Sequence, residues 1–174
     1  DIWYTGDYYS ASGILLYQAS GITVIDNNNV KDTQGVAVID SEATITNNTI
    51  SGSSWGIEVS SYHVPKTANA SIIGNTIANS TEEAIYADNP DTFLKDNIIK
   101  GNTYGYEYDN YWALFPEGTS IAEYNYWGCD AGPGSSAPGC DSTIGSIDYD
   151  PWLIDPDSDL VFESSDGTGG YVDN

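Results

Sequence analysis

The stretch Thr44-Ile45-Thr46-Asn47-Asn48-Thr49-Ile50 decides the fold, because its pattern recurs along the chain. Each copy has an apolar or small residue three positions before a key asparagine and a large apolar residue two positions after it. Five asparagines hold the key position: Asn28, Asn48, Asn75, Asn97 and Asn125. They are 20, 27, 22 and 28 residues apart. Repeats of this length indicate stacked supersecondary units.

A second pattern runs in phase with the first. Seven to nine residues after the first four key asparagines, a small residue is followed by an apolar-x-apolar strand, as in Gly35-Val36-Ala37-Val38 and Gly56-Ile57-Glu58-Val59. The alternation predicts strands with one face inward and one face outward. Because both patterns keep the same phase, we expect each unit to be one turn of a coil of strands.

Asparagine at a fixed place in every turn predicts a ladder, in which each side-chain amide bonds to those above and below it. Asparagine also suits a tight bend, since it accepts left-handed backbone angles and bonds its own backbone. The alternative is an antiparallel β-sandwich with Asn-rich turns. Sandwich strands, however, do not usually share one in-phase template.

The turns that contain "NNTI", "GNTI" and "DNII" resemble the right-handed parallel β-helix superfamily, which includes pectate lyases. The residues Asn125-Tyr126-Trp127-Gly128, Gly132-Pro133 and Asp148 to Leu153 resemble a final-turn motif of many secreted β-helix proteins of bacteria and archaea. The resemblance implies an all-β solenoid of about five to six turns. It does not imply one function, because the superfamily includes enzymes, adhesins and surface-layer proteins.

The chain length favours one domain. We expect the β-helix over residues 1–153, with a lead-in at 1–12 and a closing loop and last strand at 128–153. Residues 154–174 are expected to be an acidic tail, which holds one apolar strand candidate, Leu160-Val161-Phe162.

The composition is strongly acidic, with 26 Asp and Glu against four Lys and no Arg, for a net charge of −22. Such a chain repels nucleic acid and anionic lipid and suits cation-rich surroundings. No stretch approaches the ~20 apolar residues of a membrane span. Methionine is absent even at position 1, which favours a processed N-terminus and an extracellular, cell-surface location.

The two cysteines, Cys129 and Cys140, flank a loop rich in Gly and Pro. A disulfide that closes this loop would stabilise the fold by roughly 3 kcal/mol on the chain-entropy model, and it implies an oxidising compartment. A metal site is the alternative. Zinc normally needs four ligands, and the single histidine, His63, is distant in the sequence.

Two further groups of residues are candidate sites. Alternating acidic residues near the C-terminus have a spacing that suits Ca²⁺, although they lack the Gly and distal Glu of an EF-hand loop; a solvated acidic edge is the alternative. These residues are Asp148, Asp150, Asp155, Asp157 and Asp159. Asn-x-Ser/Thr triplets begin at Asn47, Asn69 and Asn79 and are candidate glycosylation sites, although such triplets also arise by chance.

Catalysis finds little support in the sequence. The lyases that the chain resembles use Arg or Lys as a base with Ca²⁺, whereas this chain has no Arg and its four Lys lie at turn or loop positions. The pairs Glu82-Glu83 and Asp88 with Asp91 could serve as glycosidase carboxylates, but neighbouring carboxylates are expected by chance here. We therefore expect no catalytic site and no required cofactor, with Ca²⁺ as the one candidate ion.

The ends of the coil favour a structural role. A coil of strands exposes unpaired backbone at its ends, and repeated contact between copies builds filaments. We therefore expect a secreted protein that assembles with itself into a surface layer, sheath or filament. The final-turn motif and the acidity resemble archaeal surface β-helix proteins, most specifically a methanogen sheath protein.

Two other functions remain open, a polysaccharide-active enzyme or glycan-binding module and an adhesin fragment. A run of aromatic residues could either stack on sugars or pack in the core and at subunit contacts. These residues are Tyr104, Tyr106, Tyr108, Tyr111 and Trp112.

Overall fold

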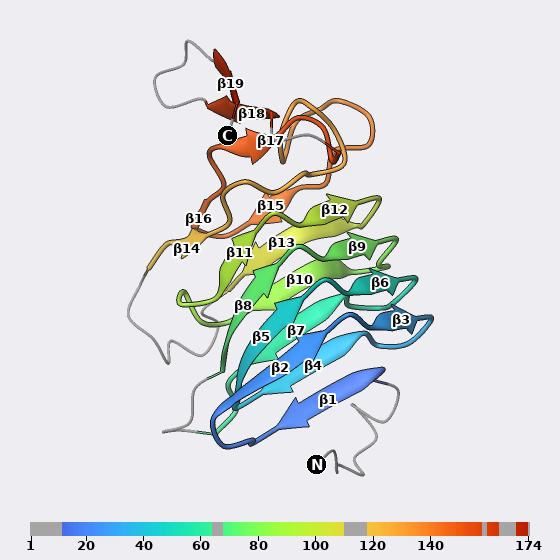
Figure 1. The fold of residues 1–174 in the computed structure, drawn as a ribbon, viewed down its shortest axis with the longest axis vertical. Coiled ribbons are helices and arrows are strands. Elements are labelled where there is room, and N and C mark those ends of the chain that lie inside the picture. Colours follow the sequence, from blue (N-terminus) through green and yellow to red (C-terminus); the bar gives the residue numbers. More distant parts are fainter. Residues whose placement is uncertain (1–11, 64–67, 110–117, 158–159, 164–169, 174) are drawn as a thin grey trace.

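The computed structural model describes residues 12–63, 68–109, 118–157, 160–163 and 170–173. These residues form strands, turns and loops, and contain no helix. They wind into a right-handed parallel β-helix whose turns stack along the long axis of the molecule (Figure 1). The fold class predicted from the repeats is confirmed.

Three parallel sheets form the walls of the coil. Sheet A consists of β1 (Ile14–Tyr17), β4 (Val36–Ile39), β7 (Ile57–Ser60), β10 (Glu83–Ala87), β13 (Tyr104–Tyr108) and β15 (Thr143–Ile144). Sheet B consists of β2 (Ile22–Asp26), β5 (Glu42–Thr46), β8 (Asn69–Ile73), β11 (Phe93–Lys95), β14 (Ser120–Ile121) and β16 (Ile147–Asp148). Sheet C consists of β3 (Asn29–Lys31), β6 (Thr49–Ser51), β9 (Thr76–Ala78) and β12 (Ile98–Lys100).

The C-terminal end of the coil is built differently. Tyr126 bridges Ile98 to Leu153 and so extends sheet C by single pairs. The strand β17 (Trp152–Leu153) then pairs antiparallel with β18 (Leu160–Glu163), and β18 pairs antiparallel with β19 (Gly170–Asp173). The apolar strand candidate after residue 154 is therefore β18, and it is hydrogen-bonded to the last strand of the coil.

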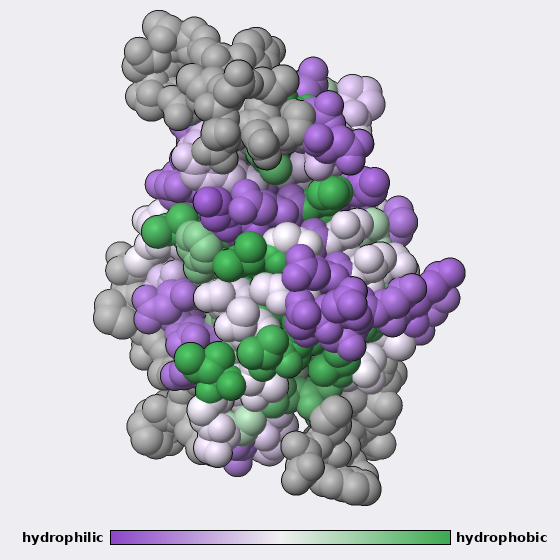
Figure 2. Space-filling view, viewed as in Figure 1, coloured by the Kyte–Doolittle hydropathy of each residue, from purple (hydrophilic) through white to green (hydrophobic). Residues whose placement is uncertain are grey.

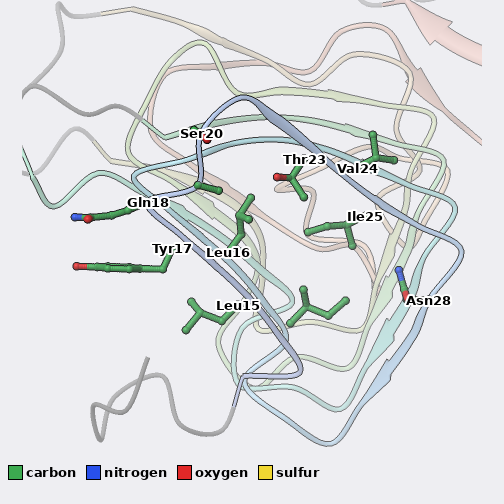
Figure 3. Close-up of a pocket in the computed structure, with 11 residues that line it drawn as sticks. Leu15, Leu16, Tyr17, Gln18, Ser20, Thr23, Val24, Ile25 and Asn28 are labelled. Carbon is green, nitrogen blue, oxygen red and sulfur yellow. The ribbon is translucent and has the colours of Figure 1, made fainter. Parts of the chain in front are cut away.

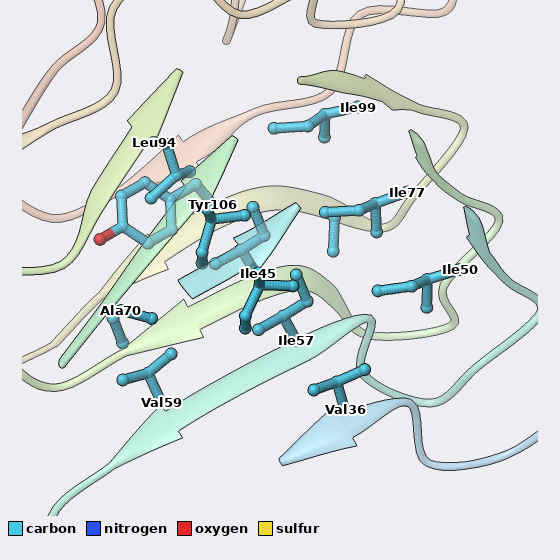
Figure 4. Close-up of a cluster of buried hydrophobic side chains, with 14 of the residues drawn as sticks. Val36, Ile45, Ile50, Ile57, Val59, Ala70, Ile77, Leu94, Ile99 and Tyr106 are labelled. Atoms are coloured by element: carbon cyan, nitrogen blue, oxygen red, sulfur yellow. The ribbon is translucent and has the colours of Figure 1, made fainter. Parts of the chain in front are cut away.

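Columns of inward-facing residues fill the coil (Figure 4). In-register pairing places Ile45, Ile72 and Leu94 in one column and stacks a second column on Ile50 and its partners in sheet C. The sequence predicts seven inward residues, all of which are 0% exposed: Ile45, Ile50, Ile57, Ile72, Ile77, Leu94 and Ile99. The predicted core is confirmed.

The bend from sheet B to sheet C uses a left-handed residue directly before each key asparagine. Asn27, Asn47, Asp96 and Tyr124 have φ of 57°, 54°, 55° and 57°, and Gly74 has φ of 67°. Asn, Asp and Gly tolerate this conformation at little cost. Two of these residues, Asn27 and Asn47, are asparagines at the bend, as the sequence predicts, and they precede the key asparagines Asn28 and Asn48.

The key asparagines form a continuous ladder. In the four turns from Asn48 onward, the Oδ1 atom of the key asparagine accepts hydrogen bonds from both the backbone N–H and the side-chain amide of the key asparagine in the preceding turn, at 2.8–3.0 Å. Each buried amide also donates to backbone carbonyls, as Asn75 does to Ile45. Four of the five are at most 1% exposed, whereas Asn28 lies open at the first described turn. The ladder thus satisfies polar groups that burial would otherwise leave unpaired.

Truncating one side chain of the inward column tests the register. We expect Ile72→Ala to lower the free energy of unfolding by ~2–5 kcal/mol, because it leaves a cavity between Ile45 and Leu94. Ile73→Ala, which changes the half-buried outward neighbour on the same strand, should cost less than about 1 kcal/mol. Urea titration of both variants makes the comparison, and equal losses would contradict the assignment of faces.

Removing one amide of the ladder tests its role. Asn75→Ala removes the acceptor of two donors of Asn48 and one of the two donors to Asn97 Oδ1, since the backbone N–H of residue 75 remains, so we expect a loss of ~1–3 kcal/mol. The exposed Asn29 gives a matched control, and Asn29→Ala should stay within about 0.5 kcal/mol of the parent. Thermal and urea unfolding measure both, and a neutral Asn75→Ala would show that the ladder adds no stability.

Candidate functional site

A groove on the outer face of sheet A is the first candidate site. In-register pairing places Glu58, Tyr86 and Glu107 side by side on β7, β10 and β13. Their neighbours Ile57, Ile85 and Tyr106 face the core, so alternation turns these three side chains outward. The groove has a volume of about 290 Å³, and its other lining residues are Trp55, Tyr62, Glu82 and Glu83. It thus combines four carboxyl groups with three aromatic rings.

The carboxyl groups of the groove lie in different environments. Glu58 is only 4% exposed, and its Oε1 accepts hydrogen bonds from Ser60 Oγ at 3.0 Å and from Tyr62 Oη at 3.1 Å. Burial raises the pKa of Glu107, and the neighbouring Glu83 carboxylate raises this pKa further. Glu107 therefore holds a proton to higher pH than an ordinary glutamate does.

Asp88 lies two residues after the outward-facing Tyr86, just beyond the end of β10 in sheet A. Burial raises the pKa of Asp88 to about 6, against the lowering effect of hydrogen bonds from Ser61, whose backbone N–H lies 2.7 Å from Oδ2. Its Oδ1 is buried and has no hydrogen-bond partner. A carboxyl group with a pKa of about 6 is of the kind that acid–base chemistry uses.

The sequence identified only part of this groove. Glu82 and Glu83, one of the two predicted carboxylate pairs, both line it. The other pair is divided, because Asp88 is buried and Asp91 is exposed. No site prediction from the sequence covers the other five lining residues, which are Trp55, Glu58, Tyr62, Tyr86 and Glu107. One sequence feature could have located part of the groove. The middle residue of each apolar-x-apolar strand faces outward, and these middle residues lie side by side on neighbouring turns.

The run of aromatic residues is divided in the same way. Tyr106 is 0% exposed, and its hydroxyl lies 2.7 Å from Ser120 Oγ. Tyr108 is also buried, whereas Tyr104 is exposed. Tyr111 and Trp112 lie outside the described residues. Packing rather than sugar stacking therefore describes Tyr106 and Tyr108.

The N-terminal end of the coil is the second candidate site. Here a hollow of about 740 Å³ opens at the first turn, and Leu16, Thr23 and Ile25 point into it (Figure 3). Eleven residues from Ile14 to Asn28 line the hollow, and none of them carries a charge. In a chain of net charge −22, an end without lining charges is suited to meet another protein surface.

His63 contacts a buried carboxylate on the neighbouring turn. Asp40 Oδ1 accepts hydrogen bonds from the backbone N–H groups of Tyr62 at 2.7 Å and His63 at 3.1 Å, and Oδ2 contacts His63 Nδ1. Burial acts to raise the pKa of Asp40, but these bonds outweigh it and hold the pKa below its usual value. The pair therefore fixes the start of a loop, and the imidazole is partly exposed at the surface.

The remaining predicted residues occupy separate places. Cys129 and Cys140 form a disulfide with a Cα–Cα distance of 5.0 Å. Asp148, Asp155 and Asp157 are exposed and Asp150 is half-buried, while Asp159 lies outside the residues whose side chains are described. Within the described part of the chain, no three His, Cys, Asp or Glu side chains converge on a point where they could hold a metal ion.

The three glycosylation candidates differ in accessibility. Asn47 and Asn79 are exposed at bends, with φ of 54° and 57°, whereas Asn69 lies half-buried in β8. Asn47 also donates a hydrogen bond to Asp26 Oδ1 at 3.0 Å. The two bends are therefore the positions where an attached glycan would meet least obstruction.

The comparisons agree with this architecture. The family profile described as a right handed beta helix region matches residues 12–135. This chain therefore belongs to the right-handed β-helix family. Neither curated proteins nor solved structures give a significant match. In the described residues, no helix is long and apolar enough to cross a membrane.

The raised pKa of Asp88 predicts a pH dependence of stability. The folded pKa of about 6 lies above the usual value of 3.8, so the folded state binds the extra proton between these values and loses stability as pH rises through them. Asp88→Asn should therefore raise the free energy of unfolding by about 1–2 kcal/mol at pH 7.5 and by almost nothing near pH 4.

Urea unfolding at pH 4, 5.5 and 7.5 measures this difference. Asp91→Asn serves as the control, because Asp91 is exposed and its substitution should produce no pH-dependent change. If Asp88→Asn shifts stability equally at all three pH values, the Asp88 carboxyl does not titrate as described.

Proposed function

We propose that this chain is a structural protein of the cell exterior that assembles with itself through unpaired strand edges at the coil ends, forming a layer, sheath or filament. The observation that carries the proposal is the open N-terminal end. There β1, β2 and β3 are the terminal strands of their sheets, and each pairs with one described strand only.

The free edge of β2 has a defined set of backbone groups. Parallel strands bond their neighbour through alternate residues. The N–H of Asn27 donates to the carbonyl of Thr46 in the next turn, so the backbone groups of residues 23 and 25 also face β5. The N–H and C=O groups of Ile22, Val24 and Asp26 consequently point along the coil axis on the side opposite β5. An edge of this kind is a template for pairing with another chain.

Side chains on the same strand support an interface. Ile22 is 69% exposed and Val24 is 65% exposed, and apolar surface gathers over β2 in the space-filling view (Figure 2). Large exposed apolar side chains beside an unpaired strand mark a contact surface. The disulfide is consistent with an oxidising exterior, and the resemblance of the final turn to archaeal surface proteins leads us to propose a cell-surface location, with a methanogen sheath as its most specific form.

The groove on sheet A favours a second candidate function. Trp55, Tyr62 and Tyr86 line it together with carboxyl groups, and aromatic faces with hydrogen-bonding groups suit a carbohydrate. Glu107, whose pKa is raised by burial, could also act as the acid of glycoside hydrolysis with a second carboxyl group of the groove. This candidate makes the chain a glycan-binding module or glycan-active enzyme.

The assembly of the purified chain distinguishes the two functions. We expect light scattering and electron microscopy to show regular polymers that increase with protein concentration. Salt or Ca²⁺ should favour them, because a net charge of −22 per copy opposes contact until it is screened or bridged. A chain that stays monomeric throughout contradicts the structural proposal. If that chain also binds or cleaves a glycan, and loses this activity in Trp55→Ala and Glu107→Gln, the second function replaces it.

A further inference from the structure

The two ends of the coil cannot be joined head to tail by continuing the same ladder. At the C-terminal end, Asn125 accepts from Asn97, and the N–H of Leu153 bonds the carbonyl of Asn125. Trp152 then takes the place of the next asparagine and is 7% exposed. The antiparallel strands β18 and β19 follow. Sheet C is thus closed at this end by strands of the opposite direction.

The N-terminal end has the complementary property, since its ladder remains open. Asn28 donates both its backbone N–H and its amide to Asn48, while its Oδ1 accepts no hydrogen bond from any described residue and lies at the surface. The outward N–H and C=O groups of β2 continue this open rim. An occupant of this end must therefore offer backbone groups or amides to a strand edge.

The distribution of charge favours one partner for the N-terminal end of the coil. Each copy carries −22, so two copies meet most readily where both surfaces lack charge. No charged residue lines the N-terminal hollow, whereas the C-terminal end exposes Asp148, Asp155 and Asp157. Contact between two N-terminal ends therefore brings together two uncharged hollow linings, with the exposed Asp26 as the charged residue on β2.

We propose that two copies of the chain pair through their N-terminal ends, with β2 of one copy antiparallel to β2 of the other. A two-fold axis across the coil axis reverses the strand direction, so the outward N–H and C=O groups of Val24 in each copy meet those of its mate. The two hollows then face each other, which covers the apolar groups that line them. This inference rests on the strand-edge pairing of the proposed function and specifies its symmetry.

A contact of this kind is isologous and closes on itself. The dimer, rather than the single chain, then becomes the repeating unit. A layer or filament needs a second contact at the other end of the coil, which the edge of β19 that no described strand covers would supply.

Two substitutions at one position provide the test. In Val24→Pro the outward N–H is lost, while the bonds of residues 23, 25 and 27 to β5 remain, which is the arrangement that proline tolerates on an edge strand. In Val24→Thr the N–H is retained. We expect Val24→Pro to weaken dimerisation by roughly 10- to 100-fold, because each of two copies loses one donor, and Val24→Thr to leave it nearly unchanged.

Sedimentation velocity of the full chain over a range of concentrations measures dimerisation, and circular dichroism confirms folding of each variant. Hydrogen exchange of the wild-type chain gives an independent readout that needs no variant. The amides of Ile22, Val24 and Asp26 should exchange rapidly in the monomer and become protected in the dimer.

The outcomes separate this inference from the proposed function. If Val24→Pro leaves association unchanged, the N-terminal contact is overturned. Protection of the three amides already in the monomer overturns it too, because the chain would then cover its own edge. In either case, polymers that persist would still support the structural function. Dimers that behave as described but never grow support the contact and contradict the structural function. A chain that never associates contradicts both.

Discussion

The asparagine ladder is the interaction on which the rest of the structure depends. Each amide fixes the next turn at a strand spacing of about 4.8 Å and satisfies two donors from the turn before it. A parallel pair that slips by one residue moves its apolar side chains to the wrong face. By holding one position of every turn in line, the ladder keeps Ile45, Ile72 and Leu94 in a single column.

Because the ladder holds one position of every turn in place, the turns can differ in length. Key asparagines are 20 to 28 residues apart, although the strands of each sheet remain in register. The additional residues lie mainly between sheets A and B, where the loop that begins at Ser61 is tied to Asp40 and Asp88. Differences in turn length therefore change the outer surface and the ends of the coil, where a β-helix can carry function.

How much could be predicted from the sequence depends on whether the signal is local. The core was predictable, because an apolar residue three before and two after each asparagine must face inward if the asparagines align. The groove was not, because Glu58, Tyr86 and Glu107 are 28 and 21 residues apart in sequence and carry no pattern until the register is known. The Asp40–His63 contact was missed for the same reason. The closure of sheet C by Trp152 and β18 was also missed, since antiparallel pairing lies outside the repeat.

Acidity and strand edges act in opposite directions in this molecule. A net charge of −22 opposes contact between copies, whereas the N-terminal hollow has no charged lining residue and β2 has an edge that no described strand covers. The end-to-end assembly that we propose would keep the coil axes aligned with the axis of a filament. Fibre diffraction from aligned assemblies tests this most directly: the account predicts a reflection near 4.8 Å along the fibre axis, the spacing of strands stacked along the coil. The same reflection perpendicular to the fibre axis would show that the coils associate side by side and would contradict the account.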